Sequence, residues 1–201
     1  MNTRKKGQSR RPSFRFRWVL LIGAGILGFI VLSSSSVLYA AHLENNDAFC
    51  ASCHTEPEST FVDRGQGGTA VDLASSHAGH GVHCIQCHSG PGAAGRLDAM
   101  TVGASDLLAF ETGGFHDPAV LTVPIDDANC LKCHSDVPNT QDFREHFHAF
   151  LPKWQALDPQ AATCVDCHEA HVTGGLTNLS FLTESTTTAV CQRCHNFVGR
   201  Q

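Results

Sequence analysis

The chain has 201 residues, of which 14 are basic and 19 acidic, and this charge is unevenly distributed. The segment 1–17 holds seven basic side chains and no acidic one, so the remainder carries seven basic and all 19 acidic side chains, a balance of −12. This acidic balance argues against a nucleic-acid-binding protein and favours docking on a positively charged patch of a protein partner. Aromatic residues make up 7% of the chain, which is little material for a conventional core.

Residues 18–41 are the first predicted element, a stretch without a charged side chain. As a helix it would span about 36 Å, which is enough to cross a bilayer. The basic residues before it predict that residues 1–17 form a cytoplasmic tail and that residues 42–201 lie outside the cytoplasmic membrane. We therefore expect a single-pass protein with an extracytoplasmic domain.

A cleaved signal peptide is the alternative interpretation of the same stretch. The strictly apolar part ends at Leu32, and the four serines at 33–36 could precede a cleavage site. Tyr39, however, is bulky where a cleavage site before residue 42 needs a small residue. We favour a retained transmembrane anchor.

The pattern Cys-x-x-Cys-His occurs five times after this stretch and contains all ten cysteines. It is the attachment signature of c-type haem: both thiols bond covalently to the porphyrin, and the histidine binds the iron on one face. We number the motifs and their haems 1 to 5 in chain order. They comprise Cys50, Cys53 and His54; Cys84, Cys87 and His88; Cys130, Cys133 and His134; Cys164, Cys167 and His168; and Cys191, Cys194 and His195.

Ten cysteines could also form a disulfide framework or zinc sites. Neither alternative requires a histidine directly after the second cysteine of each pair. With 13 histidines in 201 residues, chance would place one after all five pairs with odds of about one in a million, if positions are independent. The sequence therefore predicts five covalently bound haem c groups.

The motif spacing predicts how the domain is organised. The first cysteines of the motifs stand at positions 50, 84, 130, 164 and 191, so the step from motif 1 to motif 2 equals the step from motif 3 to motif 4. The repeated step indicates a duplicated two-haem unit, with haems 1 and 2 in about 42–115 and haems 3 and 4 in about 116–175. Residues 176–201 then hold haem 5.

The predicted fold is mainly α with extensive loops and little or no β structure. Five macrocycles in a small domain would provide much of the core, so we expect no stable fold without haem. Residues 95–110 have helical spacing of apolar side chains. Residues 142–151 read as a short helix that Pro152 should end or kink.

The second axial ligand of each iron must come from outside the motifs. His42, at the membrane boundary, is expected to be interfacial. Within the remaining clusters the sequence leaves the choice open: His146 and His148, two apart, would point to different sides of a helix. The candidate distal ligands are His77, His80, His83, His116, His146, His148 and His171, together with Met100, which could serve one haem.

The anchor, the motif shortly after it and the paired motifs resemble the NapC/NirT family of membrane-anchored c-type cytochromes, which includes the small subunit of cytochrome c nitrite reductase. The match covers about residues 10–175. The segments that look like the four family motifs are FCASCH at 49–54, CIQCH at 84–88, NCLKCH at 129–134 and CVDCHEAH at 164–171. The resemblance implies an electron carrier that takes electrons from membrane menaquinol or ubiquinol and passes them to a periplasmic reductase.

Three features depart from this family. Its members usually have four haems, and this chain has a fifth motif. The nitrite reductase subunit has a methionine shortly after its first motif, where this chain has TEPE at 55–58. The family also has an acidic residue near haem 1 that is associated with quinol. Asp106 is the candidate here for a proton acceptor, and the alternative is an ordinary solvated acid on a helix surface.

Three functions are compatible with these features. The first is a cytochrome that relays electrons from the quinol pool to a soluble or membrane-associated redox protein and, if it oxidises quinol itself, acts as a quinol dehydrogenase. The second is a passive relay, as a homo-oligomer or as a subunit of a larger redox complex. The third is a terminal reductase, which needs one haem with an open distal position. We favour the first.

Because every cysteine lies in an attachment motif, the mature chain should carry five haems and no free thiol. The intact mass should exceed that of the polypeptide by five haem units. Protein from a host with working c-type maturation that lacks one or more haems would contradict this prediction.

Overall fold

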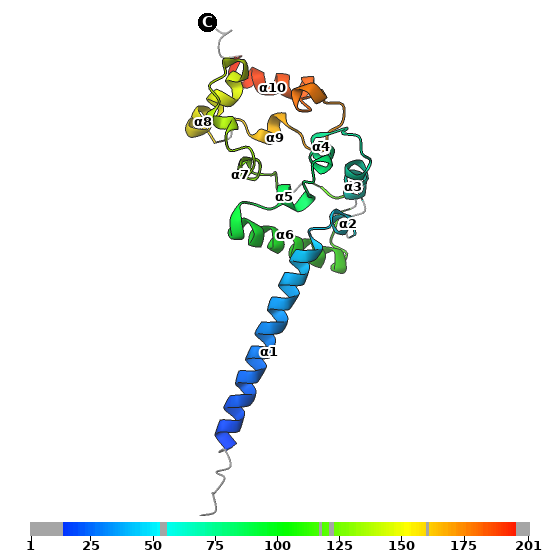
Figure 1. Ribbon diagram of the computed structural model, residues 1–201, viewed down its shortest axis with the longest axis vertical. Coiled ribbons are helices and arrows are strands. Elements are labelled where there is room, and N and C mark those ends of the chain that lie inside the picture. The colour runs from blue at the N-terminus through cyan, green and yellow to red at the C-terminus, as the bar shows by residue number, and fades with distance from the viewer. Residues whose placement is uncertain (1–13, 53–55, 117, 121–122, 160, 196–201) are drawn as a thin grey trace, which may run out of the picture. The chain divides into compact units, whose positions relative to one another are not determined.

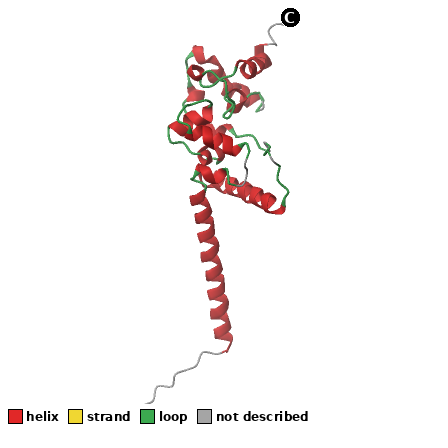
Figure 2. Ribbon diagram, turned by 90° about the vertical axis from the view of Figure 1, so that its right-hand side faces the viewer, coloured by secondary structure: helices red, strands yellow, loops and turns green. Residues whose placement is uncertain are grey.

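The computed structural model of the chain describes residues 14–52, 56–116, 118–120, 123–159 and 161–195. The described residues form helices and loops, and their only β contact is an isolated bridge between Leu176 and Leu182 (Figure 2). The predicted helical fold is therefore confirmed. The elements are α1 Phe14–Leu43, α2 Asp47–Cys50, α3 Glu58–Gln66, α4 Leu73–Gly79, α5 Cys84–His88, α6 Gly92–Thr112, α7 Asp127–Leu131, α8 His146–Leu157, α9 Cys164–Cys167 and α10 Glu184–His195, with short 3-10 turns η1 Val137–Asn139, η2 Phe143–Glu145 and η3 Thr177–Leu179.

The chain divides into two units, Met1–Leu43 and Glu44–Gln201. The described part of the first unit is α1, one unbroken helix of 30 residues (Figure 1). Its residues 15–43 are long and apolar enough to cross a membrane, and their most apolar stretch of 18 residues has a mean hydropathy of 2.1. The helix continues through the four serines, where the hydroxyl of Ser36 donates to the carbonyl of Leu32 at 3.0 Å and so needs no other partner.

The second unit contains the five motifs, each on or beside a short helix. Motif 1 begins at the end of α2, α5 is motif 2, α7 leads into motif 3, α9 begins motif 4, and α10 ends with motif 5. These helices touch in chain order: α2 contacts α5, α5 contacts α7, α7 contacts α9, and α9 contacts α10 (Figure 1). The motifs thus follow one another in space as they do in sequence.

One hydrogen bond, from a backbone N–H to an aspartate side chain, occurs twice in this series. Asp47, three residues before motif 1, accepts a hydrogen bond from the backbone N–H of Cys84 at 2.9 Å. Asp127, three residues before motif 3, accepts one from Cys164 at 2.6 Å. Each contact spans 37 residues, and each joins the first motif of a predicted two-haem unit to the second. The repeated step between motifs therefore corresponds to a repeated local structure.

The polypeptide has a very small core of its own. Only five apolar residues are buried among the described ones: Leu151, Ala162, Cys167, Phe181 and Val190. Four of these form one cluster, against which Phe147, Trp154 and Leu182 pack. Most of the apolar surface that stabilises a domain of this size must therefore come from elsewhere, and this agrees with the expectation that haem groups fill the interior.

One of the two predicted helices is confirmed, and the other differs in its bounds. The stretch predicted at 95–110 lies within α6, but none of its apolar residues is buried, and Leu97 and Leu108 are 63% and 64% exposed. The helix predicted at 142–151 instead begins as the turn η2 and continues as α8 through Pro152 to Leu157. Leu151 and Trp154 belong to the core cluster on either side of Pro152, so packing outweighs the backbone hydrogen bond that proline removes.

Because α1 is continuous across the serines, the protein should remain in the membrane. Alkaline carbonate washing of membranes should leave it in the pellet, since a helix of this length and hydropathy is not released by removing electrostatic contacts. Release into the soluble fraction, with an N-terminus that maps beyond residue 33, would favour the cleaved signal instead.

Candidate haem sites

Four motif histidines each face a second histidine from another part of the chain. The ring centres of the pairs are 6.3 Å apart for His88 and His171, 6.0 Å for His134 and His77, 6.1 Å for His168 and His148, and 6.4 Å for His195 and His146. Each pair thus combines the histidine of motif 2, 3, 4 or 5 with one of the predicted distal candidates.

This separation fits two ligands of one haem iron. An imidazole–metal bond is about 2 Å long and the ring centre lies about 1.1 Å behind the coordinating nitrogen, so opposite ligands have ring centres about 6.2 Å apart. The planes of the pairs are near parallel for His88/His171 and His168/His148, at 22° and 9°. They are near perpendicular for the other two pairs, at 88° and 78°. Both arrangements are compatible with a shared iron, because each ring can rotate about its bond to the metal.

The hydrogen bonds of two of these rings leave the other ring nitrogen free for a metal. Nδ1 of His77 lies 2.9 Å from the carbonyl of Leu73, and Nδ1 of His168 lies 3.2 Å from that of Ser180. A carbonyl only accepts, so Nδ1 carries the proton and Nε2 keeps its lone pair, as in many metal sites. Ser180 has a left-handed backbone, with φ of 52°, which costs free energy in a residue other than glycine.

Burial keeps two of these rings neutral. It lowers the pKa of the half-buried His168 and His171, and a neutral imidazole is the form that binds a metal. Nδ1 of His148 and Nδ1 of His171 are buried and have no hydrogen-bond partner among the described residues. A buried polar atom without a partner is costly. The residues present therefore fit a bound haem between the rings of each pair.

A charged network positions His171. The guanidinium of Arg64 donates to the carboxylate of Asp72 at 3.1 Å and to the carbonyl of His171 at 3.0 Å. The ring of Phe61 stacks on His171 with 3.9 Å between the centres. Burial alone would raise the pKa of Asp72, but hydrogen bonds from Ser75 and Arg64 outweigh it and hold this pKa below its usual range.

The same network also positions the ligand of the neighbouring haem. Asp72 is the N-cap of α4 and accepts from the backbone N–H of Ser75 at 2.7 Å, and α4 carries His77. One buried carboxylate thus supports both the haem 2 candidate His171 and the haem 3 candidate His77. Arg64 and Asp72 could not be recognised from the sequence, because their contact with His171 joins residues 107 positions apart.

Direct contacts also join the motifs themselves. Before haem attachment, when these cysteines are thiols, Cys84 donates to Cys50, which holds the pKa of Cys50 below its usual range although burial would raise it. Cys164 donates to Cys130 in the same way and lowers the pKa of Cys130 to about 7. These are the first cysteines of motifs 1 and 2 and of motifs 3 and 4.

Motifs 2 and 3 meet through polar side chains. The amide of Asn129, directly before motif 3, donates to the carbonyl of Cys87 at 2.8 Å. The ammonium of Lys132, within motif 3, donates to the carbonyls of Gln86 and Ser89. An ion pair between Arg193 of motif 5 and Asp166 of motif 4, at 3.3 Å, completes the series.

The remaining histidine candidates have other surroundings. His83 is exposed and pairs with Asp47 at 3.2 Å. His80 is exposed, and its Nδ1 lies 2.8 Å from the carbonyl of Ser76. His116 is exposed on the loop after α6, and His42 belongs to α1. Within the described residues no second histidine ring stands opposite any of these four, so the structure separates them from the four paired candidates.

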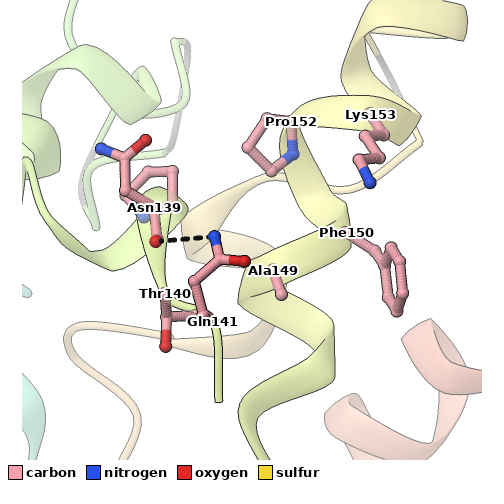
Figure 3. Close-up of a pocket in the computed structure, with 8 residues that line it drawn as sticks. Asn139, Thr140, Gln141, Ala149, Phe150, Pro152 and Lys153 are labelled. Atoms are coloured by element: carbon pink, nitrogen blue, oxygen red, sulfur yellow. Dashed lines mark hydrogen bonds between the residues drawn. The ribbon is translucent and has the colours of Figure 1, made fainter. Parts of the chain in front are cut away.

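Haem 1 is only partly covered by the described residues. Cys53 and its predicted ligand His54 lie outside them, so their relation to other side chains is not described. Met100 is half-buried on α6, and Asp106 is exposed on the same helix. A pocket lies between residues 138–141 and α8 near Pro152 (Figure 3). It is lined by no cysteine or histidine, so it is not one of the haem positions.

Part of the chain matches a known family. Residues 115–196 match the cytochrome c3 family, and this range contains motifs 3, 4 and 5. This match and the relative described next support a c-type cytochrome with covalently bound haem, as the resemblance to the NapC/NirT family predicts.

A particular relative is the tetraheme c-type cytochrome CymA of Shewanella oneidensis. It is 28% identical to this chain over 186 residues, which cover 79% of this chain and 91% of the relative. No solved structure matches the chain.

Substitution of His77, with substitution of His80 as the matched control, tests whether His77 is a distal ligand. Both lie on or at the end of α4 and bond a carbonyl four residues earlier through Nδ1, but only His77 faces a motif histidine. His77→Ala should open one iron to an external ligand, so that the reduced protein binds one more carbon monoxide per chain than the wild type. His80→Ala should leave the carbon monoxide difference spectrum unchanged.

The haem content of both variants should equal that of the wild type, because the thioether bonds are untouched. Equal carbon monoxide binding by the two variants and the wild type would contradict the assignment of His77.

Proposed function

We propose that the protein is a membrane-anchored pentahaem cytochrome that passes electrons from the quinol pool to an extracytoplasmic redox partner. The haems, when bound, supply one-electron oxidation and reduction. The chain holds them in place through the ten motif cysteines and the five motif histidines. His171, His77, His148 and His146 complete the coordination of haems 2, 3, 4 and 5.

The unbroken series of contacts between consecutive motifs carries this proposal. Motifs 1 and 2 meet through Asp47 and Cys84, motifs 2 and 3 through Asn129 and Lys132, and motifs 3 and 4 through Asp127. Motifs 4 and 5 meet through the ion pair of Asp166 and Arg193. Bis-histidine coordination keeps iron low-spin, which suits electron transfer with little rearrangement. A row of such sites along the whole domain is what a relay requires.

A fifth haem in this row is supported by two observations. Motif 5 is complete and lies within the range that matches the cytochrome c3 family. Its histidine, His195, faces His146 at the same ring separation as in the other pairs. The relative CymA is a tetraheme protein by name, so the fifth haem would extend the relay beyond that of the relative.

Electron entry is proposed at haem 1. The basic tail favours an N-terminus in the cytoplasm, and motif 1 begins seven residues after α1, which keeps haem 1 close to the end of the anchor along the chain. Quinol oxidation releases two protons with its two electrons, so the donor site needs a proton acceptor. Asp106, exposed on α6, is the proposed acceptor.

Electron exit is proposed at the C-terminal end of the row, from haem 5 to a soluble or membrane-associated redox protein. The balance of −12 outside the basic tail favours a partner that presents a positive patch. The association rate should then fall as salt screens the charges.

A passive relay without its own quinol site is the second candidate. The exposure of Asp106 favours it, because a solvated carboxylate on a helix surface has no feature that marks it as a proton acceptor.

Reduction by a menaquinol analogue, followed through the haem absorption bands of the membrane-reconstituted protein, separates these candidates. The wild type should be reduced. Asp106→Asn keeps the size of the side chain but removes the proton acceptor, and it should slow this reduction by about 100-fold, a usual contribution of general acid–base catalysis. Asp98→Asn, an exposed acid on the same helix, should leave the rate unchanged.

Dithionite should reduce all three proteins equally, because it needs no quinol site. A normal rate in Asp106→Asn would remove Asp106 from the proposal. Complete absence of quinol reduction in the wild type would favour the passive relay.

A further inference from the structure

Helix α8 carries two of the paired histidines, and their partners belong to different motifs. His146 is the first residue of α8 and faces His195 of motif 5. His148, two residues later, faces His168 of motif 4. Residues two apart on a helix point to nearly opposite sides, so a single helix can reach two separate irons. The sequence predicts that His146 and His148 point to different sides of the helix, but it leaves open which of the two binds an iron.

The position of α8 between these motifs is set by the core cluster of the second unit. Leu151 of α8 is buried with Cys167 of motif 4 and with Val190, which precedes motif 5. Trp154 packs against the same cluster, and its ring lies 5.3 Å from that of Phe147. The buried apolar cluster of the described residues therefore lies where α8 meets α9 and α10.

The two motifs also contact each other directly. Arg193 and Asp166 occupy the same position within their motifs, directly before the second cysteine, and form an ion pair at 3.3 Å. Arg193 also donates to the carbonyl of Ala161. Asp166 accepts from the backbone N–H of Thr163 at 2.7 Å, so it caps α9 as well. Motif 5 is thus held against motif 4 by charge and by packing.

We infer that α8 is a shared ligand helix, in which His146 is the distal ligand of haem 5 and His148 that of haem 4. The inference rests on the proposed fifth haem and its proposed ligand, and it adds that one helix supplies the distal ligands of haems 4 and 5 and so places these two haems side by side. The Cα atoms of residues two apart on a helix are only about 5.4 Å from each other. The two irons are therefore one side-chain length from nearly the same point of the backbone, and haems 4 and 5 form an adjacent pair.

Carbon monoxide binding to the reduced full-length holoprotein tests this assignment. His146→Ala should add one carbon monoxide-binding haem per chain relative to the wild type, because it removes one distal ligand and leaves all thioether bonds intact. Lys153→Ala, which changes an exposed side chain of the same helix, is the control and should add none.

The same substitution in a variant that lacks haem 5 tests whether the new carbon monoxide site is at haem 5. When both Cys191 and Cys194 are replaced by Ser, the protein should lose one haem by mass, and His146→Ala should then add no carbon monoxide site. His148→Ala in the same background should still add one, at haem 4. An undiminished gain from His146→Ala in this background would place its ligand on another haem and overturn the inference.

His146→Met provides a test that does not depend on an open iron. A methionine ligand raises the reduction potential of a haem, so one of the five haems should titrate at a more positive potential, without new carbon monoxide binding. A redox titration that matches the wild type would overturn the assignment of His146.

The intact mass of the wild type distinguishes a failure of the pentahaem proposal from a failure of the ligand assignment. A wild type with four haems would remove the fifth haem, and this inference with it. A wild type with five haems, combined with no response to either substitution at His146, would leave the pentahaem proposal standing and reject the shared helix.

Discussion

Two imidazole rings can share one iron only if they stand on opposite faces of a flat macrocycle, with their centres about 6.2 Å apart. Four such separations occur in this chain, and each joins segments that are distant in sequence. This requirement explains the long-range contacts of the second unit. Arg64 and Asp72 bring α4 and the segment after motif 4 together, and the cluster around Leu151 brings α8 onto motifs 4 and 5.

Motifs 1 to 4 and motif 5 are joined to their neighbouring motifs by different contacts. Motifs 1 and 3 each reach the following motif through an aspartate that accepts from a backbone N–H, and their first cysteines lie next to those of the following motifs. Motif 5 has no such aspartate in the described contacts and is attached by the ion pair of Arg193 with Asp166. Motif 5 thus extends the repeated plan by a contact of its own.

The class of the protein and its helical fold could be predicted from the sequence, because haem attachment requires cysteine and histidine at fixed local spacing. The distal pairs could not be predicted. His77 faces the histidine of motif 3 and His171 that of motif 2, so each pairing passes over at least one other motif or helix, and no local pattern encodes it. The passage of α8 through Pro152 was likewise decided by packing on both sides of the proline. The repeat of Asp47 at Asp127 was visible in the sequence, since both stand three residues before a motif, and it marks the duplicated contact.

The near absence of a polypeptide core has a consequence for how the protein is produced. With five buried apolar residues among those described, a chain without its cofactors has little to fold around and remains open to proteases. The amount of protein that accumulates should therefore follow the supply of haem and the capacity of the attachment machinery, even when transcription is constant. Assembly itself then acts as the control point for the abundance of the protein.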